Sequence, residues 1–202
     1  MRAALFAFSR GGCATARRIL AALPEEAWMC YTMPRFEEPG FLPLDKAIYD
    51  VCFSSMDALI FVGACGIAVR EIAPYVQSKK TDPAVLCIDE AGRFVIPLLS
   101  GHIGGANALA ERMAEKLAEK LDATAGVTTA TDVRGKFAVD AWAARHGCAI
   151  SDMGLAKAVS AAILEEDIPL CSQFSLPAPL PEGTFAGESG PLGVFIGWRT
   201  KA

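Results

Sequence analysis

The segment LLSGHIGGANAL, residues 98–109, runs from an apolar strand-like stretch through a glycine-rich turn into the start of a helix. The predicted helix continues to residue 121, with Leu109, Met113 and Leu117 at a spacing of four and Glu and Lys between them. That spacing places the apolar side chains on one face of an amphipathic helix. Strand, turn and helix in direct succession are typical of α/β proteins, so this segment indicates the fold class.

The same succession recurs along the chain. Short apolar runs at residues 3–8, 28–32 and 58–62 each precede a loop and a predicted helix, and the run at 58–62 is entirely apolar, as in strands buried on both faces of a parallel sheet. Residues 84–88 and 93–97 flank the sequence Asp-Glu-Ala-Gly and predict a hairpin. We therefore expect an α/β fold with an open, mostly parallel sheet and helices on both faces, a three-layer arrangement of the flavodoxin or Rossmann kind.

Two regions of the chain differ in the core that they can supply. Residues 1–134 contain most of the predicted strands and the turns discussed below, and we interpret them as an amino-terminal α/β domain. Residues 135–202 contain two predicted helices, strands at 168–171 and 192–196, and a loop rich in Pro and Gly. Because so short a segment buries little core by itself, we expect a smaller middle α/β region that packs on the first domain or continues into further chain.

Composition excludes several classes of function. The chain is 52% hydrophobic and 21% charged, which excludes disorder, and its net charge of -4 without a basic block excludes nucleic acid as a partner. No apolar run reaches the roughly 20 residues of a membrane span, and the amino terminus leads into a helix in place of a cleavage site. The seven cysteines show no CxxC or Cys/His metal spacing. We expect a cytoplasmic protein with reduced cysteines and no metal site.

The first candidate turn, Gly-Ala-Cys-Gly at residues 63–66, follows the apolar run at 58–62. Gly63 and Gly66 permit a close backbone approach to a ligand, and the N–H groups of the following helix start attract anions. Arg70 lies one turn into that helix and Lys79 just beyond it. An ordinary tight strand-to-helix turn explains the same residues equally well.

The second and preferred turn contains one of only two histidines in the chain. Its glycine walls leave little packing around His102, which disfavours a core histidine and favours a general acid or base, or a donor to a ligand carboxylate. The candidate site residues here are Ser100, Gly101, His102, Gly104, Gly105 and Asn107.

The third turn, Thr-Thr-Ala-Thr-Asp at residues 128–132, follows a short predicted strand at 127–129. The hydroxyl groups of Thr128, Thr129 and Thr131 and the carboxylate of Asp132 are suited to orienting a ligand or a water molecule. Helix capping explains the same residue types equally well. Because ligands bind beyond the carboxyl ends of parallel strands, we expect all three turns at one edge of the sheet.

Other polar residues receive structural interpretations. Asp89 and Glu90 are typical of a hairpin turn, and Cys65 is interpreted as a packing residue. From the residues alone, the chain is a cytosolic α/β protein that binds a small anion, and a hydrolase or a lyase is compatible with it.

Five ordered motifs resemble one known family. GACGIAVR (63–70), DPAV (82–85), IDEAG (88–92), LLSGHIGGANAL (98–109) and TTATD (128–132) resemble the amino-terminal region of the cobalt-precorrin-5A hydrolase family (CbiG) of anaerobic cobalamin biosynthesis. The resemblance implies opening of a δ-lactone on a cobalt-bound tetrapyrrole, with release of acetaldehyde, to give cobalt-precorrin-5B. Cobalt then belongs to the substrate, so no cofactor of the protein is expected.

Opening a lactone requires an activated water and stabilisation of the oxyanion that develops, and on that basis we hypothesise roles for the candidate residues. His102 is expected as base or acid, the N–H groups around Gly104 and Gly105 as donors to developing negative charge, and Asp132 as the group that orients His102 or the water. Arg70 and Lys79 are expected to hold substrate carboxylates. The family's further carboxyl-terminal domain is not found in the sequence, and we expect it either to be truncated or to be a separate chain, with other cobalamin-pathway enzymes as further partners. The alternative is a non-catalytic tetrapyrrole-binding or scaffolding module.

Overall fold

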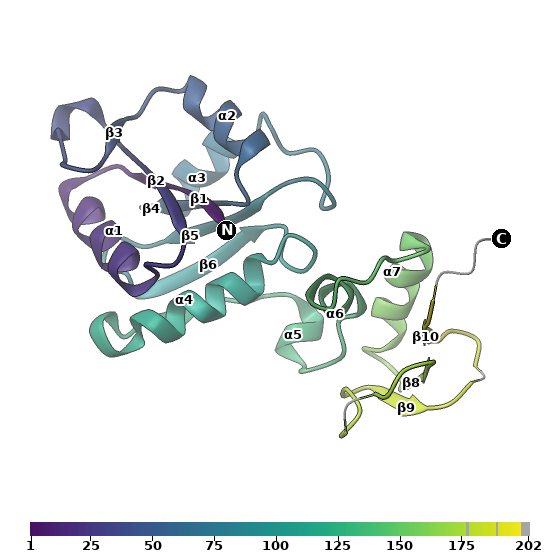
Figure 1. Ribbon diagram of the computed structural model, residues 1–202. Helices are drawn as coiled ribbons and strands as arrows, with labels where there is room; N and C mark the ends of the chain where they lie inside the picture. Colours follow the sequence, from purple (N-terminus) through teal and green to yellow (C-terminus); the bar gives the residue numbers. More distant parts are fainter. Residues whose placement is uncertain (177, 189, 199–202) are drawn as a thin grey trace. The chain divides into compact units, whose positions relative to one another are not determined.

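A computed structural model describes residues 1–176, 178–188 and 190–198 (Figure 1). The chain forms two compact units, Met1–Val127 and Thr128–Ala202, and each is described by itself. The sequence patterns predict a boundary after residue 134, which is seven residues later than the boundary in the structure. Because the structure places the boundary after Val127, the threonine-rich turn at 128–132 belongs to the second unit.

The first unit is built on a seven-stranded sheet of order β3-β2-β1-β4-β5-β6-β7. Its strands are β1 Arg2–Ala7, β2 Ala27–Thr32, β3 Leu42–Pro43, β4 Ala58–Val62, β5 Ala84–Ile88, β6 Phe94–Leu99 and β7 Thr124–Ala125. Strands β1 to β5 are parallel to one another, whereas β6 is antiparallel to β5. The predicted open, mostly parallel sheet is thereby confirmed.

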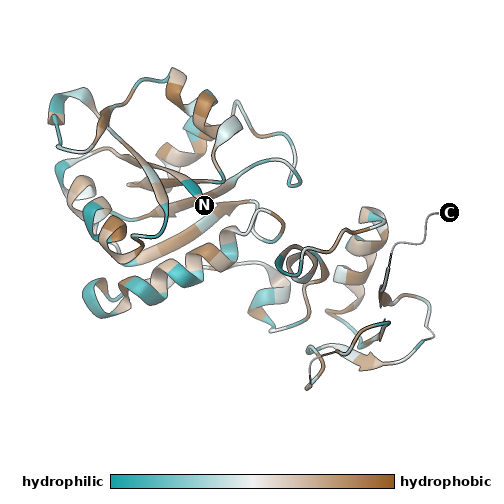
Figure 2. Ribbon diagram, in the orientation of Figure 1, coloured by the Kyte–Doolittle hydropathy of each residue, from teal (hydrophilic) through white to brown (hydrophobic). Residues whose placement is uncertain are grey.

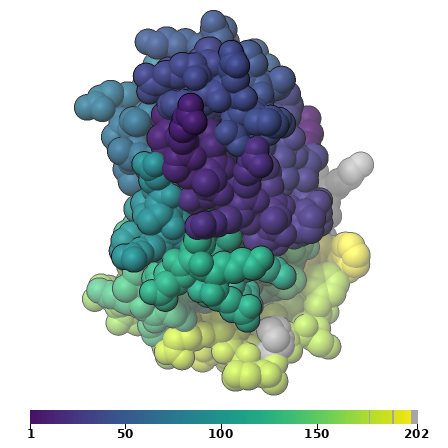
Figure 3. Space-filling model, turned by 90° about the vertical axis from the view of Figure 1, so that its left-hand side faces the viewer, coloured from purple at the N-terminus to yellow at the C-terminus, as the bar shows by residue number. Residues whose placement is uncertain are grey.

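Helices cover both faces of this sheet. The helices of the unit are α1 Arg10–Ala22, the 3-10 helix Pro34–Phe36, α2 Ala47–Ser55, α3 Cys65–Ile72 and α4 Ala106–Leu121. Buried residues of α1 and α4 pack on one face with Leu5 and Ile60, and those of α2 and α3 pack on the other face with Phe6 and Phe61. The buried residues of α4 include Leu109, Met113 and Leu117 at the predicted spacing of four, and Figure 2 shows hydrophilic residues along the same helix. In Figure 3, α4 lies directly against the purple amino-terminal residues.

The hairpin between β5 and β6 sets the direction of the strand that carries the preferred turn. Asp89 closes the hairpin, because its Oδ1 accepts a hydrogen bond from the Phe94 N–H at 2.7 Å and its Oδ2 one from the Ala91 N–H at 3.2 Å. The structural interpretation of Asp89 is thus confirmed. Strand β6 runs back along β5, so Leu99 pairs with Val85 near the amino end of β5.

The second unit is a smaller α/β region. It contains α5 Ala130–Val133, α6 Val139–Arg145, α7 Met153–Ala162, β8 Ile168–Ser172, β9 Thr184–Ala186 and β10 Val194–Ile196. The three strands form a parallel sheet of order β10-β8-β9, and Phe137, Val159, Ile163 and Ile168 form its core. The strand predicted at 127–129 is wrong: Thr129 instead stands at the start of α5, where a threonine is a favourable helix cap.

Within the described residues, no helix combines the length and the apolar character that crossing a bilayer requires.

Candidate functional site

The glycine-rich turn after β6 folds back on the first amides of α4. The Ala106 N–H donates to the Ser100 carbonyl at 3.1 Å, and the Asn107 N–H donates to the Gly101 carbonyl at 3.0 Å. Ser100 has a left-handed backbone (φ 59) and is buried, with its Oγ donating to the Asp82 carbonyl at 2.9 Å. The turn is therefore a fixed structure whose shape depends on its own backbone hydrogen bonds.

Each glycine of this turn is needed for a local reason. A Cβ on Gly104 would lie 2.4 Å from the Ser100 Cβ and 3.0 Å from the Ser100 carbonyl oxygen. A Cβ on Gly101 would lie 2.8 Å from Oδ1 of Asn107, which is itself buried. Gly105 stands before α4 with φ +79, a conformation that L side chains rarely adopt. The glycines thus let the chain pack closely around Ser100 and Asn107.

His102 follows Gly101 in this turn. Its side chain is half-buried, so the structure excludes a core histidine, and its carbonyl accepts a hydrogen bond from the Gly105 N–H at 3.0 Å. That N–H therefore already has an acceptor within the turn. The expected roles of His102 as acid or base and of the Gly104 and Gly105 N–H groups as donors stay predictions.

Asp82, which the sequence patterns left without a role, joins two of the predicted segments. Its Oδ2 accepts hydrogen bonds from the Gln77 and Ser78 N–H groups, both at 3.0 Å, while its carbonyl accepts from Ser100. The loop that carries Lys79 is thereby attached to the turn that carries His102. The sequence feature that could have drawn attention to Asp82 is the DPAV motif, of which it is the first residue.

The expectation that the first two turns share one edge of the sheet is wrong. Val62, just before the Gly63 turn, pairs with Ile88 at the carboxyl end of β5, whereas Leu99, just before the His102 turn, pairs with Val85 near the amino end of β5. Three residues of extended chain separate these pairings by about 10 Å along the strand. Because β6 is antiparallel, its carboxyl end lies at the opposite edge from those of β1 to β5.

Gly63, Gly66 and Arg70 accordingly lie apart from the His102 turn. Arg70 folds back along α3, with its Nη1 donating to the Gly66 carbonyl at 3.3 Å. The Cys87 Sγ donates to the Gly63 carbonyl at 3.2 Å, and burial raises the pKa of that thiol to about 12. A buried thiol so hard to ionise is a packing group.

The same carboxyl edge carries a contact that the sequence patterns missed. Here β1 and β4 send their helices to opposite faces, the kind of point at which α/β sheets bind ligands. Ser9 begins α1 by accepting the Gly12 N–H at 2.9 Å, and its Oγ donates to the Glu90 Oε1 at 2.8 Å. A Cβ on Gly11 would come within 2.0 Å of that same oxygen. The protein's own carboxylate therefore lies at the start of α1.

The third turn lies in the second unit. The Thr129 Oγ1 donates to the Asp132 carboxylate within the first turn of α5, and Thr131 is buried with its carbonyl accepting the Lys136 N–H at 2.8 Å. This local pairing favours the helix-start interpretation of Asp132. Its expected role toward His102 or a water molecule stays a prediction, as do the ligand contacts of Thr128, Thr129 and Thr131.

Comparisons with known proteins point to one family. Residues 47–132 match the family model described as cobalamin synthesis G N-terminal. The chain is 46% identical over 153 residues to a cobalt-precorrin-5A hydrolase of Salmonella typhimurium, covering 74% of this chain and 42% of that protein. It is 42% identical over 115 residues to a cobalt-precorrin-5A hydrolase of Priestia megaterium, covering 57% of this chain and 30% of that protein.

A solved structure shares the fold. The crystal structure of a cobalamin biosynthesis protein G homolog from Sulfolobus solfataricus superposes with a TM-score of 0.57 at 21% identity, covering 96% of this chain and 59% of that one. The chain spans less than half the length of the two curated relatives given above, 42% and 30% respectively.

Proposed function

The chain belongs to the cobalamin synthesis G (CbiG) family, and from that premise we propose that it hydrolyses cobalt-precorrin-5A to cobalt-precorrin-5B, opening a δ-lactone and releasing acetaldehyde. The observation that carries the proposal is the 46% identity to the Salmonella typhimurium hydrolase over 153 residues. The family match at 47–132 spans the whole His102 turn.

The chemistry of lactone opening supports a role for the His102 turn. Water adds to the lactone carbonyl, a C–O bond of the ring breaks, and the freed oxygen takes up a proton. Acetaldehyde then leaves when this hydroxyl loses its proton and becomes a carbonyl, the C–C bond to the macrocycle breaks, and the macrocycle carbon takes up a proton. A base must accept the proton of the attacking water, and donors must stabilise the oxyanion that forms. In this proposal His102 accepts that proton and returns it to the leaving oxygen. The hydrogen bonds around Ser100 and Gly101 hold its backbone in place.

The edge of the sheet on which His102 lies decides which cationic side chain is close enough to bind a substrate carboxylate beside it. The loop that carries Lys79 is attached to the same edge through Asp82, whereas the Arg70 guanidinium is hydrogen-bonded to Gly66 at the other edge. We therefore assign substrate carboxylates beside His102 to Lys79 and not to Arg70. Cobalt enters as part of the substrate, so no cofactor is assigned. We propose that the reaction takes place in the cytoplasm. We also propose that other cobalamin-pathway enzymes or a separate carboxyl-terminal domain are further partners of the chain.

Single-turnover hydrolysis tests this proposal. Excess chain is mixed with cobalt-precorrin-5A, and acetaldehyde is measured by coupled reduction with alcohol dehydrogenase and NADH. The proposal expects one acetaldehyde per substrate. Tetrapyrrole binding without acetaldehyde would reject hydrolysis by this chain and favour a non-catalytic tetrapyrrole-binding module, an alternative supported by the 42% of the Salmonella relative that the chain covers.

A further inference from the structure

A cavity of about 440 Å³ borders the His102 turn at the amino edge of the first unit's sheet. Ala108, Leu109 and Arg112 line it from one face of α4, because residues three and four positions apart lie on the same side of a helix, and Gly105 lines it from the position just before α4. Ala84 and Leu109 are nearly fully buried and contribute apolar surface to its wall. Gly104 and Gly105 contribute bare backbone, so the cavity opens beside the turn that carries His102.

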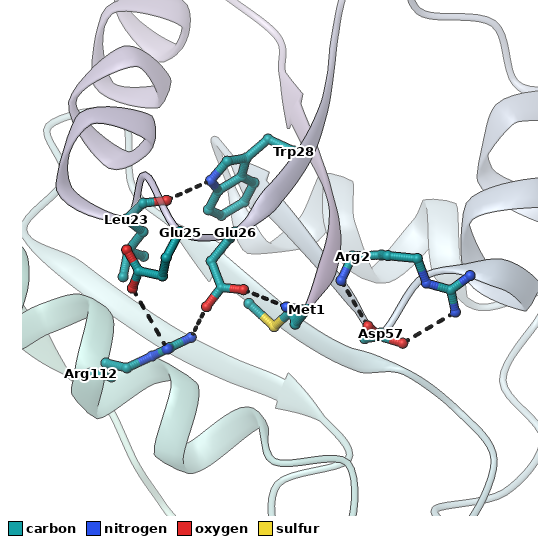
Figure 4. A network of polar contacts seen from close by, with 8 residues as sticks. All are labelled: Met1, Arg2, Leu23, Glu25, Glu26, Trp28, Asp57 and Arg112. Atoms are coloured by element: carbon teal, nitrogen blue, oxygen red, sulfur yellow. Dashed lines mark hydrogen bonds and ion pairs between the residues drawn. The ribbon is translucent and has the colours of Figure 1, made fainter.

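A fixed cation stands at the wall of this cavity. The Nη2 of Arg112 donates to the Glu26 Oε1 at 2.6 Å, and Oε2 of the same carboxylate accepts from the Met1 ammonium at 2.7 Å (Figure 4). The Glu26 side chain is only 4% exposed, so this carboxylate holds Arg112 from the protein side. Among these three hydrogen-bonded groups, two cations share one carboxylate, which is an excess of one positive charge before Glu25 is counted.

The other carboxylates near Arg112, those of Glu25 and Asp57, neutralise this positive charge only weakly. The Glu25 Oε1 is 3.9 Å from the Arg112 Nη1, and its side chain is 54% exposed, which makes it a weak and displaceable partner. Asp57, which also lines the cavity, is occupied by Arg2, whose N–H donates to its Oδ2 at 2.7 Å and whose Nη2 donates to its Oδ1 at 3.4 Å. Of the two carboxylates that the described part of the chain pairs with Arg112, Glu25 is therefore the one that a ligand carboxylate would displace.

We infer that this cavity binds one carboxylate-bearing edge of a tetrapyrrole, with Arg112 holding the carboxylate in place of Glu25. The apolar wall at Ala84 and Leu109 takes the hydrocarbon part of an acetate or propionate arm, which a charged wall would disfavour. The cavity accommodates an arm and part of one ring, so the macrocycle extends outward past Gly104 and Gly105. The inference rests on the proposed function for the class of ligand, and it adds Arg112 as a substrate-binding residue.

Fluorescence titration of the full chain with uroporphyrin, a metal-free tetrapyrrole with acetate and propionate arms, tests the inference. Arg112→Gln is compared with Lys116→Gln, which removes the same charge from an exposed position one turn along α4. Loss of a charge-assisted hydrogen bond predicts binding about tenfold weaker for R112Q, and binding within about twofold of the unaltered chain for K116Q. Equal affinities of R112Q and K116Q, or no binding to the unaltered chain, would overturn the inference.

Glu25→Gln provides a variant that leaves the Arg112–Glu26 pair intact. Because E25Q removes the competing carboxylate, the inference expects binding about twofold to fivefold tighter than that of the unaltered chain. Unchanged or weaker binding by E25Q would overturn the displacement, even if R112Q folds poorly. If uroporphyrin binding follows these expectations but no acetaldehyde is released from cobalt-precorrin-5A, the proposed hydrolysis is rejected and the Arg112 site is supported. If acetaldehyde is released but R112Q binds uroporphyrin as tightly as the unaltered chain, the hydrolysis is supported and the Arg112 site is rejected.

Discussion

Replacing Gly104 by alanine tests whether the turn around His102 is as tightly constrained as its contacts indicate. The new Cβ would lie 2.4 Å from the Ser100 Cβ and 3.0 Å from the Ser100 carbonyl oxygen, so Ser100 must move. That carbonyl accepts the first amide hydrogen bond of α4, and Ser100 itself is buried against Asp82. Overpacking costs about 1–3 kcal/mol and a weakened hydrogen bond about 1 kcal/mol. We expect G104A to lower the free energy of unfolding by about 2–4 kcal/mol.

Two other glycines provide matched controls for this variant. Gly105 has φ +79 and Gly40 has φ +82, and an added Cβ at either position meets no atom within 4 Å. Alanine at each therefore incurs only the left-handed backbone strain, about 1–2 kcal/mol. Urea unfolding followed by circular dichroism should rank G104A as clearly less stable than G105A and G40A, which should be alike. G104A as stable as G40A would refute the reasoning.

Two further predictions concern buried ionisable groups. The hydrogen bond from the Met1 ammonium, together with Arg112, lowers the pKa of Glu26 from its ordinary value of 4.5. A carboxyl group with a lowered pKa in the folded chain stabilises it above the unfolded pKa, and this contribution disappears as the pH falls through the folded value. We expect Glu26→Gln to cost about 2 kcal/mol at pH 7 and much less near pH 3, as measured by urea unfolding, and a constant cost would contradict the assignment. Because burial raises the pKa of Cys87 to about 12, iodoacetamide at pH 8 should alkylate the exposed Cys148 and spare Cys87, as read by mass spectrometry; comparable labelling rates would show that Cys87 is accessible as a thiolate.

Much of the first unit follows from local sequence patterns. The all-apolar run Ala58–Val62 and the amphipathic helix Ala106–Leu121 have the bounds that their patterns predict, because burial on two faces and burial on one face leave different periodicities. The turn sequence Asp-Glu-Ala-Gly likewise predicts the hairpin that Asp89 closes.

The grouping of the candidate residues follows less well, because it depends on strand direction. The hairpin reverses β6 and so separates the His102 turn from Gly63, Gly66 and Arg70, although each turn follows a strand in the same local manner. The pairing of Ser9 with Glu90 and that of Arg112 with Glu26 join residues 81 and 86 positions apart, and no local pattern in the sequence reports such contacts. The strand predicted at 127–129 fails because threonines favour both strands and helix starts.

Acetaldehyde release by His102→Ala tests the central claim most directly. The half-buried imidazole lies in a turn whose backbone is held by hydrogen bonds to the first amides of α4, so removing it should leave the fold and tetrapyrrole binding largely intact. Under single-turnover conditions with cobalt-precorrin-5A, we expect the rate to fall by about a hundredfold or more, the usual contribution of a positioned acid or base. Release at the rate of the unaltered chain would contradict the assignment of His102 to the reaction.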